Sequence, residues 1–484
     1  MDWLQASDYW LARWVFERLL AAIYLLGFLT AATQFPALLG EHGLLPAPRF
    51  LRLAPFRETP SLFHAHYSDR LLQVVAWTGM AVAALLLLGA PQAGPAWLPM
   101  LAWLALWALY LSIVNIGQTF YAFGWESLLL EAGFMAIFLG PASTAPPTPM
   151  LWLLRWLLFR VEFGAGLIKI RHDPCWRNLT CLYYHHETQP MPNPLSWYFH
   201  HLPEPVHRLE VLGNHVAQLL APWGLFLPQP VATFAALVMI VTQLYLVVSG
   251  NYAWLNWLTI VIACSGLADG VLAAVLPVGA AAFPVAPVWF PAATVGVTAL
   301  VLVLSYWPAR NLVSRHQLMN APFNAFHLVN AYGAFGTVTR RRLEVVVEGT
   351  ADTTLSPETT WVEYEFKGKP TDLRRLPPQV APYHLRLDWL MWFAALSPAY
   401  AEGWFLPFLL RLLEDDRPML RLLARNPFRE KPPVFVRARL FRYRYTSWAE
   451  LRRTRAWWTR DFAGEFAGPV RLRPIEDGSG TLAR

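Results

Sequence analysis

Repeated apolar segments of about 20 residues restrict the fold of this chain more than any other feature. They cover residues 18–39, 71–90, 97–116, 231–249 and 252–266, and 56% of all residues are hydrophobic. An apolar helix of this length crosses the hydrocarbon core of a bilayer. Counting also residues 125–140, 150–170, 270–283 and 288–307, the sequence predicts about seven to nine spans.

The charge pattern changes near residue 308. Residues 1–308 hold 12 Lys and Arg against 14 Asp and Glu, whereas residues 309–484 hold 27 against 18. Residues 343–349, 361–367 and 434–445 have the apolar or alternating pattern of strands, and residues 385–396 and 404–424 read as helices. The alternation slips between Leu440 and Phe441, which predicts a β-bulge or a change of strand partner.

These patterns predict a polytopic α-helical membrane protein with a C-terminal soluble α+β, strand-rich domain. The transmembrane helical domain covers residues 1–308, with interfacial loops at 40–69 and 171–208, and the soluble domain covers residues 309–484. The basic residues of the tail are mixed with acidic ones, and no nucleic-acid recognition motif is present. We therefore expect membrane lipids rather than nucleic acid as partners.

Residues 150–170 are long enough to span a membrane but carry several charges. Each charge near a helix centre costs about 2.5–3.5 kcal/mol on insertion scales. Arg155, Glu162 and Lys169 are seven residues apart and so form one row along the helix. Arg160 falls on another side, and Glu126 or Glu131 of the preceding helix is its expected partner.

Two interpretations of these charges remain open. They can form a structural ion-pair row, or they can line a polar cavity within the membrane that includes Arg155, Arg160, Glu126 and Glu131. Lys169 is the only lysine before Lys367, and a buried lysine, unlike arginine, can serve as a base. In the second interpretation Lys169 and Glu162 are the catalytic candidates.

The loop that follows this helix is rich in Cys, His and aromatic residues. Cys175 and Cys181 have five residues between them, a spacing that permits a disulfide or redox pair and equally permits two reduced thiols. The histidines lack the spacing of a metal motif, so we expect no metal site. The remaining loop candidates for a functional role are His185, His186, Glu187 and Trp197.

Six strings carry a family resemblance: PCWRNLTCLYYHHETQPMPNPLSWY at 174–198, SGNYAWLNWLTI at 249–260, LVNAYGAFGTVTRRRLEVVVEGT at 328–350, WVEYEFKGKP at 361–370, VAPYHLRLDWLMWFAAL at 380–396 and ARNPFREKPPVFVRARLFRYRYT at 424–446. In these strings the chain resembles the lipase maturation factor family. The resemblance implies an integral membrane protein that assists the folding or assembly of secreted lipases, with a lipase or another exported protein as client and the tail outside the cytoplasm. Animal members reside in the endoplasmic reticulum membrane.

Composition points to a different membrane for this chain. Only 4 of its 39 basic residues are lysines, a bias that favours a bacterial member in the inner membrane. The nine-span count and the positive-inside tendency would put the basic tail in the cytoplasm, whereas the resemblance puts it outside. Long domains override the charge tendency, so we expect the tail outside.

A shorter string, AGLIKI at 165–170, is similar to a membrane helix of vitamin K-dependent γ-carboxylase, in which a lysine acts as a base. Lys169 occupies that position. The alternative function is thus an integral membrane enzyme that uses Lys169 on a lipophilic or quinone-like substrate. Nucleotide-binding and esterase motifs are missing from the sequence; the cofactor is unknown and enzymatic activity stays open.

Overall fold

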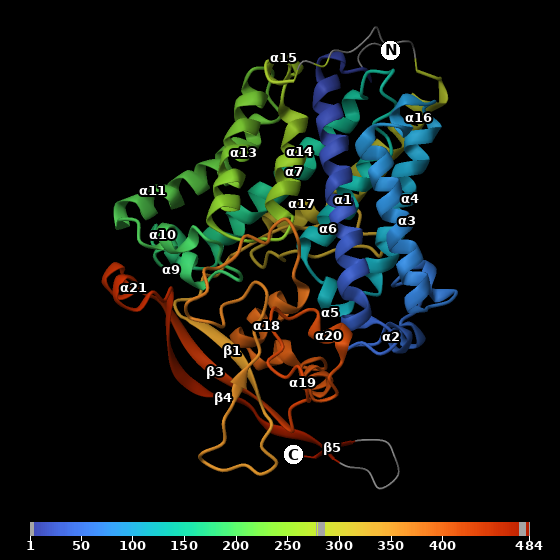
Figure 1. Cartoon of the computed structure of the whole chain (residues 1–484). Coiled ribbons are helices and arrows are strands. Elements are labelled where there is room, and N and C mark those ends of the chain that lie inside the picture. Colours follow the sequence, from blue (N-terminus) through green and yellow to red (C-terminus); the bar gives the residue numbers. More distant parts are fainter. Residues whose placement is uncertain (1–3, 277, 279–285, 474–480, 484) are drawn as a thin grey trace.

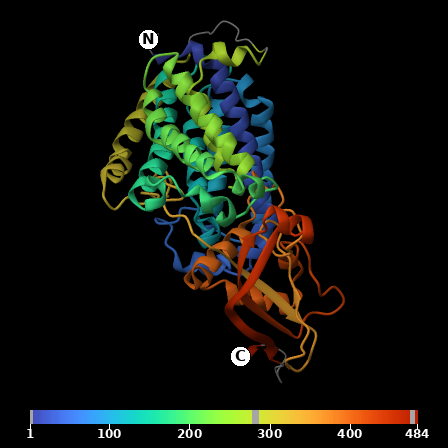
Figure 2. The same cartoon turned by 90° about the vertical axis from the view of Figure 1, so that its left-hand side faces the viewer.

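The computed structural model describes residues 4–276, 278, 286–473 and 481–483. The predicted span at 270–283 therefore lies partly outside the described residues. A helical bundle sits on a smaller domain built around an antiparallel sheet, and the start of the bundle and the last strand lie at opposite ends (Figures 1 and 2). This arrangement confirms a polytopic helical membrane protein with a C-terminal α+β domain.

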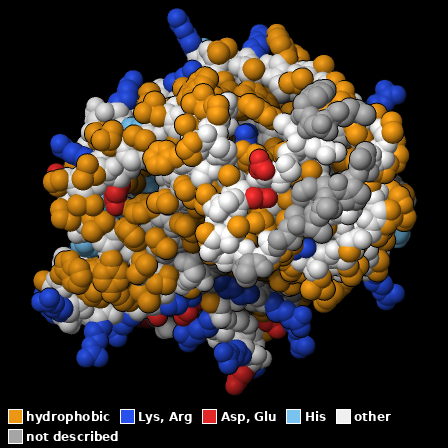
Figure 3. All heavy atoms as spheres, turned by 90° about the horizontal axis from the view of Figure 1, so that it is seen from above, with side chains coloured by type: hydrophobic (Ala, Val, Ile, Leu, Met, Phe, Trp, Pro, Cys, Tyr) orange, Lys and Arg blue, Asp and Glu red, His pale blue; other side chains and the backbone are white. Residues whose placement is uncertain are grey.

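Within the described residues, five helical segments are long and apolar enough to cross a membrane. They are Ser7–Leu39, which contains α1 (Trp10–Leu39), α3 (Asp69–Leu88), α4 (Trp97–Asn115), α13 (Val231–Ser249) and Trp289–Val313, which contains α16 (Trp289–Leu304) and α17 (Tyr306–Val313). Large apolar side chains on these helices, among them Trp77, Phe234 and Val303, are exposed, as lipid-facing residues are. From the N-terminal end, broad hydrophobic patches cover the bundle and Lys and Arg project at its periphery (Figure 3).

The remaining segments of the bundle differ from simple lipid-facing spans. Helix α6 (Gly124–Ala136) and helix α14 (Leu255–Ala263) are short, and α7 (Thr148–Arg171) is long but carries the predicted charges. Helices α6 and α7 are buried along most of their length. The charges of α7 therefore meet protein partners instead of acyl chains, which removes most of the cost of placing them in the bilayer.

Short helices connect the spans. They are α2 (Ala47–Leu53), α5 (Gln118–Tyr121), α8 (Pro174–Arg177), α9 (Leu182–Thr188), α10 (Ser196–His200), α11 (Glu204–His215), α12 (Ala221–Gly224) and α15 (Asp269–Ala273). Helices α8 to α10 form a cap over one end of α7. Helix α11 leads away from the cap and continues into a π-helical turn, Val216–Leu220, before α12 (Figure 1).

The tail domain is built on a five-stranded antiparallel sheet with the order β2-β1-β3-β4-β5. Its strands are β1 (Arg342–Thr350), β2 (Val362–Glu363), β3 (Phe435–Tyr445), β4 (Trp458–Arg473) and β5 (Thr481–Ala483). The register between β3 and β4 shifts between Leu440 and Phe441. This shift confirms the irregularity that the slipped alternation predicts.

Helices α18 (Arg386–Leu396), α19 (Phe405–Leu413), α20 (Arg417–Leu420) and α21 (Trp448–Thr454) complete the tail. The prediction of one helix over 404–424 is wrong. Asp415 has a positive φ of 53°, and Asp416 caps α20 by accepting a hydrogen bond from the backbone N–H of Met419. A left-handed residue followed by an N-cap ends one helix and starts another.

The segment between α17 and β1 lies along the bundle. Asn330 donates its backbone N–H to Glu131 of α6, and the side-chain amide of Gln317 donates to the carbonyl of Gly164 in α7. The division at residue 308 assigned this segment to the soluble domain, yet its contacts are with the membrane helices. It therefore ties the tail to the buried centre of the bundle.

Candidate functional site

A cavity of about 440 Å³ lies where the bundle, the cap and the tail meet. Its walls are largely apolar and aromatic, and they come from α7, α13, α14, the cap, residues 332–337 and tail helix α18. Glu162 and Lys169 of α7 form part of the wall, as do His185 and His186 of α9. The cavity thus has an apolar body with a few converging polar groups, the usual composition of a small-molecule site.

Glu162 and Lys169 are joined through a glutamine. Lys169 Nζ donates to Gln218 Oε1 at 2.8 Å, and Gln218 Nε2 donates to Glu162 Oε2 at 3.1 Å. The two charged side chains are 1% and 6% exposed. An acid and a base separated by one amide keep their polar atoms satisfied without forming a direct ion pair.

The polar chain continues into two other helices. Gln243 of α13 donates to Glu162 Oε1 at 2.7 Å, and Asn256 of α14 donates to Gln243 Oε1 at 2.6 Å. Gln218 itself belongs to the π-helical turn, a local irregularity that often marks functional positions in helices. The sequence interpretation missed Gln218 and Gln243, although amides inside apolar spans are a usable signal.

The other four charges that the sequence predicts for a membrane cavity do not line this one. Arg160 pairs with Glu131, and Arg160 Nη1 also donates to the carbonyl of Asn330 at 2.8 Å. Arg155 donates to the carbonyls of Ser265 and Leu225 and borders a separate pocket of about 270 Å³. These contacts join α7 to α6 and to the segments around Leu225, Ser265 and Asn330.

Glu126 reaches the tail. Its carboxylate Oε1 lies 2.8 Å from Arg386 Nη1 of α18 and 3.5 Å from His384 Nδ1, and its Oε2 accepts a hydrogen bond of 2.5 Å from Tyr110. All these side chains are buried. Glu126 is thus a joint between the membrane helices and the tail.

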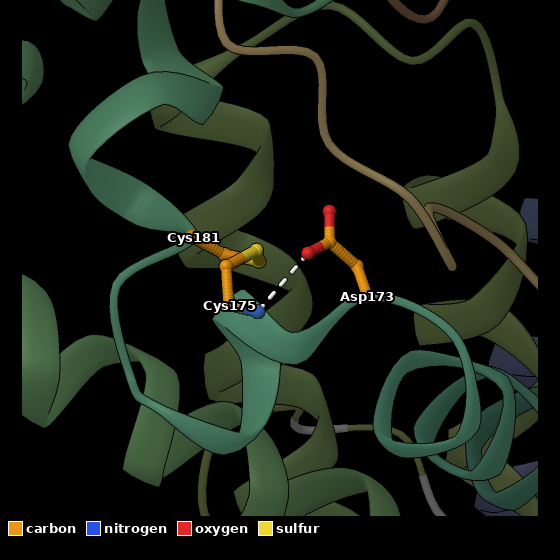
Figure 4. A group of neighbouring side chains, drawn as sticks. All are labelled: Asp173, Cys175 and Cys181. Carbon is orange, nitrogen blue, oxygen red and sulfur yellow. Dashed lines mark hydrogen bonds between the residues drawn. A yellow bond between two sulfur atoms is a disulfide. The ribbon is translucent and has the colours of Figure 1, made fainter.

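Cys175 and Cys181 form a disulfide, with their Cα atoms 4.8 Å apart. Asp173 lies beside them, and its Oδ1 accepts the backbone N–H of Cys175 at 3.0 Å at the start of α8 (Figure 4). Arg340 pairs with the same carboxylate at 2.8 Å. Burial opposes ionisation of Asp173, but the hydrogen bonds from Arg340 and from the Cys175 and Val338 N–H groups outweigh it and hold its pKa below the usual range.

The four loop candidates divide into two pairs. His185 and His186 line the cavity, whereas Glu187 and Trp197 anchor the cap to the tail. Glu187 accepts the backbone N–H of Tyr445 at 2.8 Å, and Trp197 Nε1 donates to the carbonyl of Thr446 at 2.9 Å. The last two residues therefore position the cap and do not contact the cavity.

His185 is a neutral, hydrogen-bonded wall residue. Burial, together with electrostatic repulsion from nearby His186 and Lys169 whenever they are protonated, lowers the pKa of His185 to about 3. Its Nε2 lies 2.8 Å from the hydroxyl of Tyr252, which itself donates to Gln189. His185 therefore donates to Tyr252 and fixes its own tautomer.

His186 has a different setting. The fold brings it within reach of His207 and Glu210 of α11, and one ligand atom from each of the three lies within 4.8 Å of the others. The sequence interpretation missed this group because His186 lies 21 residues before His207. Only the packing of α9 against α11 makes them neighbours.

Comparison with known proteins covers both parts of the chain. Residues 11–274 match the family description Lipase maturation factor transmembrane domain, and residues 328–468 match Lipase maturation factor C-terminal domain. No solved structure matches the chain. Neither family match concerns a carboxylase, so the second resemblance gains no support.

Individual relatives agree with this result. Lipase maturation factor 1 of Homo sapiens is 40% identical, with 98% of this chain and 90% of the relative covered. Lipase maturation factor 1 of Mus musculus is 39% identical over 98% of this chain and 89% of its own length. Lipase maturation factor 2 of Homo sapiens is 31% identical over 96% of this chain and 83% of its own length. The resemblance seen in the sequence strings is confirmed, and the chain belongs to the lipase maturation factor family.

Proposed function

We propose that this protein is a membrane-embedded maturation factor that assists the folding or assembly of exported lipases. One observation carries the proposal: the chain is 40% identical to a protein named for lipase maturation, over 98% of its length. The similarity includes the bundle, the cap and the tail, whose buried joints make them one unit. A role shared with the relatives would therefore use the whole architecture.

The edge of the tail sheet is the proposed contact for the client. Strand β4 pairs with β3 from Trp458 to Val470, and it pairs with β5 only from Arg471 to Arg473. Among the described residues, the other edge of β4 has no strand partner from Thr459 to Val470. Phe462 on this strand is 57% exposed. An extended segment of a partly folded lipase can add to such an edge through main-chain hydrogen bonds.

The disulfide supports a location for the tail. Cys175 and Cys181 lie in the cap, which the tail contacts through Trp197 and Thr446. Disulfides persist on the oxidising side of a membrane. We therefore propose that cap and tail lie outside the cytoplasm and, because lysine is so scarce, that the membrane is the inner membrane of a bacterium.

The cavity supports a second, subordinate role. Its apolar body and the Glu162–Gln218–Lys169 end fit a lipid-like molecule with one polar group. Mass spectrometry of the gently solubilised protein tests this role. A bound lipid-like molecule that is lost in Gln218→Leu supports it, and an empty wild-type protein contradicts it.

Deletion of the gene, followed by complementation, tests the main proposal. Exported lipase activity should fall in the deletion strain while lipase transcript stays constant, and the wild-type gene should restore it. If every exported lipase keeps its abundance and activity after deletion, the proposal fails. If lipase activity does fall, a site-specific photocrosslinker at Phe462, with Glu430 as the control position, identifies the client at the β4 edge.

A further inference from the structure

A second polar group lies at the wall of the cavity, apart from the Glu162–Gln218–Lys169 chain. It consists of His186 on α9 and of His207 and Glu210 on α11. His207 and Glu210 are three residues apart and so share one face of α11. His186 and Glu210 line the cavity, and the two histidines are 1% and 2% exposed.

The imidazole of His186 has no hydrogen-bond partner. Within the described part of the chain, neither Nδ1 nor Nε2 of this buried ring is satisfied. Its Nε2 lies 3.9 Å from Glu210 Oε2, which is too long for a hydrogen bond. Two ligands of one ion, each about 2.0–2.2 Å from it, are separated by about 3–4 Å. An unsatisfied buried histidine at this distance from a carboxylate fits the spacing of two ligands of one cation.

His207 offers a nitrogen to the same carboxylate. Its Nδ1 lies 2.8 Å from Glu210 Oε2, the length of an ordinary hydrogen bond in which Nδ1–H donates to the carboxylate. Its Nε2 lies 3.4 Å from the backbone carbonyl of His200, which is a long contact. A metal ion that binds at Nδ1 would displace this proton, since a histidine ligand must be deprotonated at the binding nitrogen.

The remaining oxygen of the carboxylate is already engaged. Tyr245 of α13 donates its hydroxyl to Glu210 Oε1 at 2.5 Å. This bond orients the carboxylate and leaves Oε2 directed at the two imidazoles. Tyr245 thus holds the carboxylate ligand in place.

We propose that His186, His207 and Glu210 bind a zinc ion at the wall of the cavity. Two imidazoles and one carboxylate are the ligands of zinc sites that keep a fourth position open. Because His186 and Glu210 border the cavity, the fourth position of such a zinc ion would be available to water or to an oxygen atom of a molecule bound there. The site goes beyond the proposed role in lipase maturation, and neither depends on the other.

Metal content of the purified protein tests this inference. The chain is purified in mild detergent through an affinity tag without histidines, stripped with a chelator, incubated with ZnCl₂ and desalted. Elemental analysis by mass spectrometry then gives zinc per chain. Wild type should retain about one zinc, and His186→Gln and His207→Gln should lose at least tenfold in affinity in a chelator competition. His201→Gln, which changes a half-buried histidine of the same cap, should bind as wild type does.

Two further measurements keep the result interpretable if a variant folds poorly. Addition of zinc should raise the midpoint of thermal unfolding of the wild type and of His201→Gln, but not that of His186→Gln. Cobalt in place of zinc should give the visible absorption of a low-symmetry site in the wild type. His186→Gln, which lacks one of the three ligands, should not give this absorption. Zinc retention in His186→Gln equal to the wild type, or no zinc retention in the folded wild type, overturns the inference.

Discussion

Glu126 of the membrane helix α6 and Arg386 of the tail helix α18 form an ion pair of 2.8 Å in which both side chains are fully buried. The guanidinium of Arg386 also lies 3.4 Å from the ring centre of Tyr121 and donates to the carbonyl of Phe120. Two residues 260 positions apart in the sequence thus join the bundle to the tail. The tail is therefore fixed against the bundle, with α18 forming part of the cavity wall.

Replacement of Arg386 should separate these two parts. Arg386→Met removes the positive charge and leaves Glu126 buried without its partner, which costs about 3–5 kcal/mol in the free energy of unfolding. Thermal unfolding in detergent measures the loss. The control Arg425→Met breaks the more exposed pair with Glu365 within the tail and should cost less than about 1 kcal/mol. If Arg386→Met costs no more than about 1 kcal/mol in the free energy of unfolding, as the control does, the buried joint does not stabilise the protein.

A close approach at Gly133 gives a second prediction. A Cβ at this position of α6 would lie 1.9 Å from the hydroxyl of Tyr24, which is fully buried in α1. Gly133→Ala should displace Tyr24 from its hydrogen bond to Leu129 and destabilise the protein by about 1–3 kcal/mol.

Gly296→Ala is the matched control for this variant. A Cβ at Gly296 of α16 meets nothing within 4 Å, and the gain in helix propensity is up to about 1 kcal/mol. The unfolding midpoint should therefore fall for Gly133→Ala and stay or rise for Gly296→Ala. A fall for both would place the effect in helix geometry rather than in the contact with Tyr24.

The amide between Lys169 and Glu162 gives a third prediction. Gln218→Leu removes a donor from Glu162 and an acceptor from Lys169, and unsatisfied buried charged groups should lower stability by about 1–3 kcal/mol. Gln73→Leu, which removes one hydrogen bond to the carbonyl of Ala32 in α1, should cost about 1 kcal/mol. Unfolding midpoints that do not distinguish the two variants would mean that Gln218 does not link the charges.

Asp173 gives a prediction about pH. Its folded-state pKa lies below the unfolded value of about 3.9. The stabilisation from its pair with Arg340 and its N–H donors is therefore present above about pH 4–5 and is lost as the pH falls through the folded pKa. Asp173→Asn should cost about 1–2 kcal/mol near pH 7, and the gap in unfolding midpoint from wild type should shrink in acid. Parallel pH profiles would contradict this assignment.

The sequence predicted the features that depend on hydrophobic pattern and on charge in an apolar context. The buried charges of α7 could be identified because a bilayer does not tolerate them without partners. Glu131 was one of the two partners predicted for Arg160, and it is the one in the structure. The bulge next to Leu440 could be predicted because the side-chain alternation of a strand is strict.

Other features could not be predicted from local patterns. Strand β4 holds Gly464, Gly468 and Pro469, residues that are depleted in strands, and it forms because β3 offers a long partner. The predicted strand at 361–367 shortens to Val362–Glu363, since Glu365 pairs with Arg425 instead. The joining of Gln218 to Glu162 and of His186 to His207 depends on how helices pack, which one sequence does not specify.

The specific activity of an exported lipase, measured as activity per mass of lipase protein, is the decisive measurement for the proposed role in lipase maturation. In the deletion strain, wild-type protein should raise this value, and Phe462→Glu at the β4 edge should not, at equal levels in the membrane. Leu355→Glu, at another exposed apolar position of the tail, should act as wild type does. A specific activity that is the same with and without the protein would rule out the proposed role in lipase maturation.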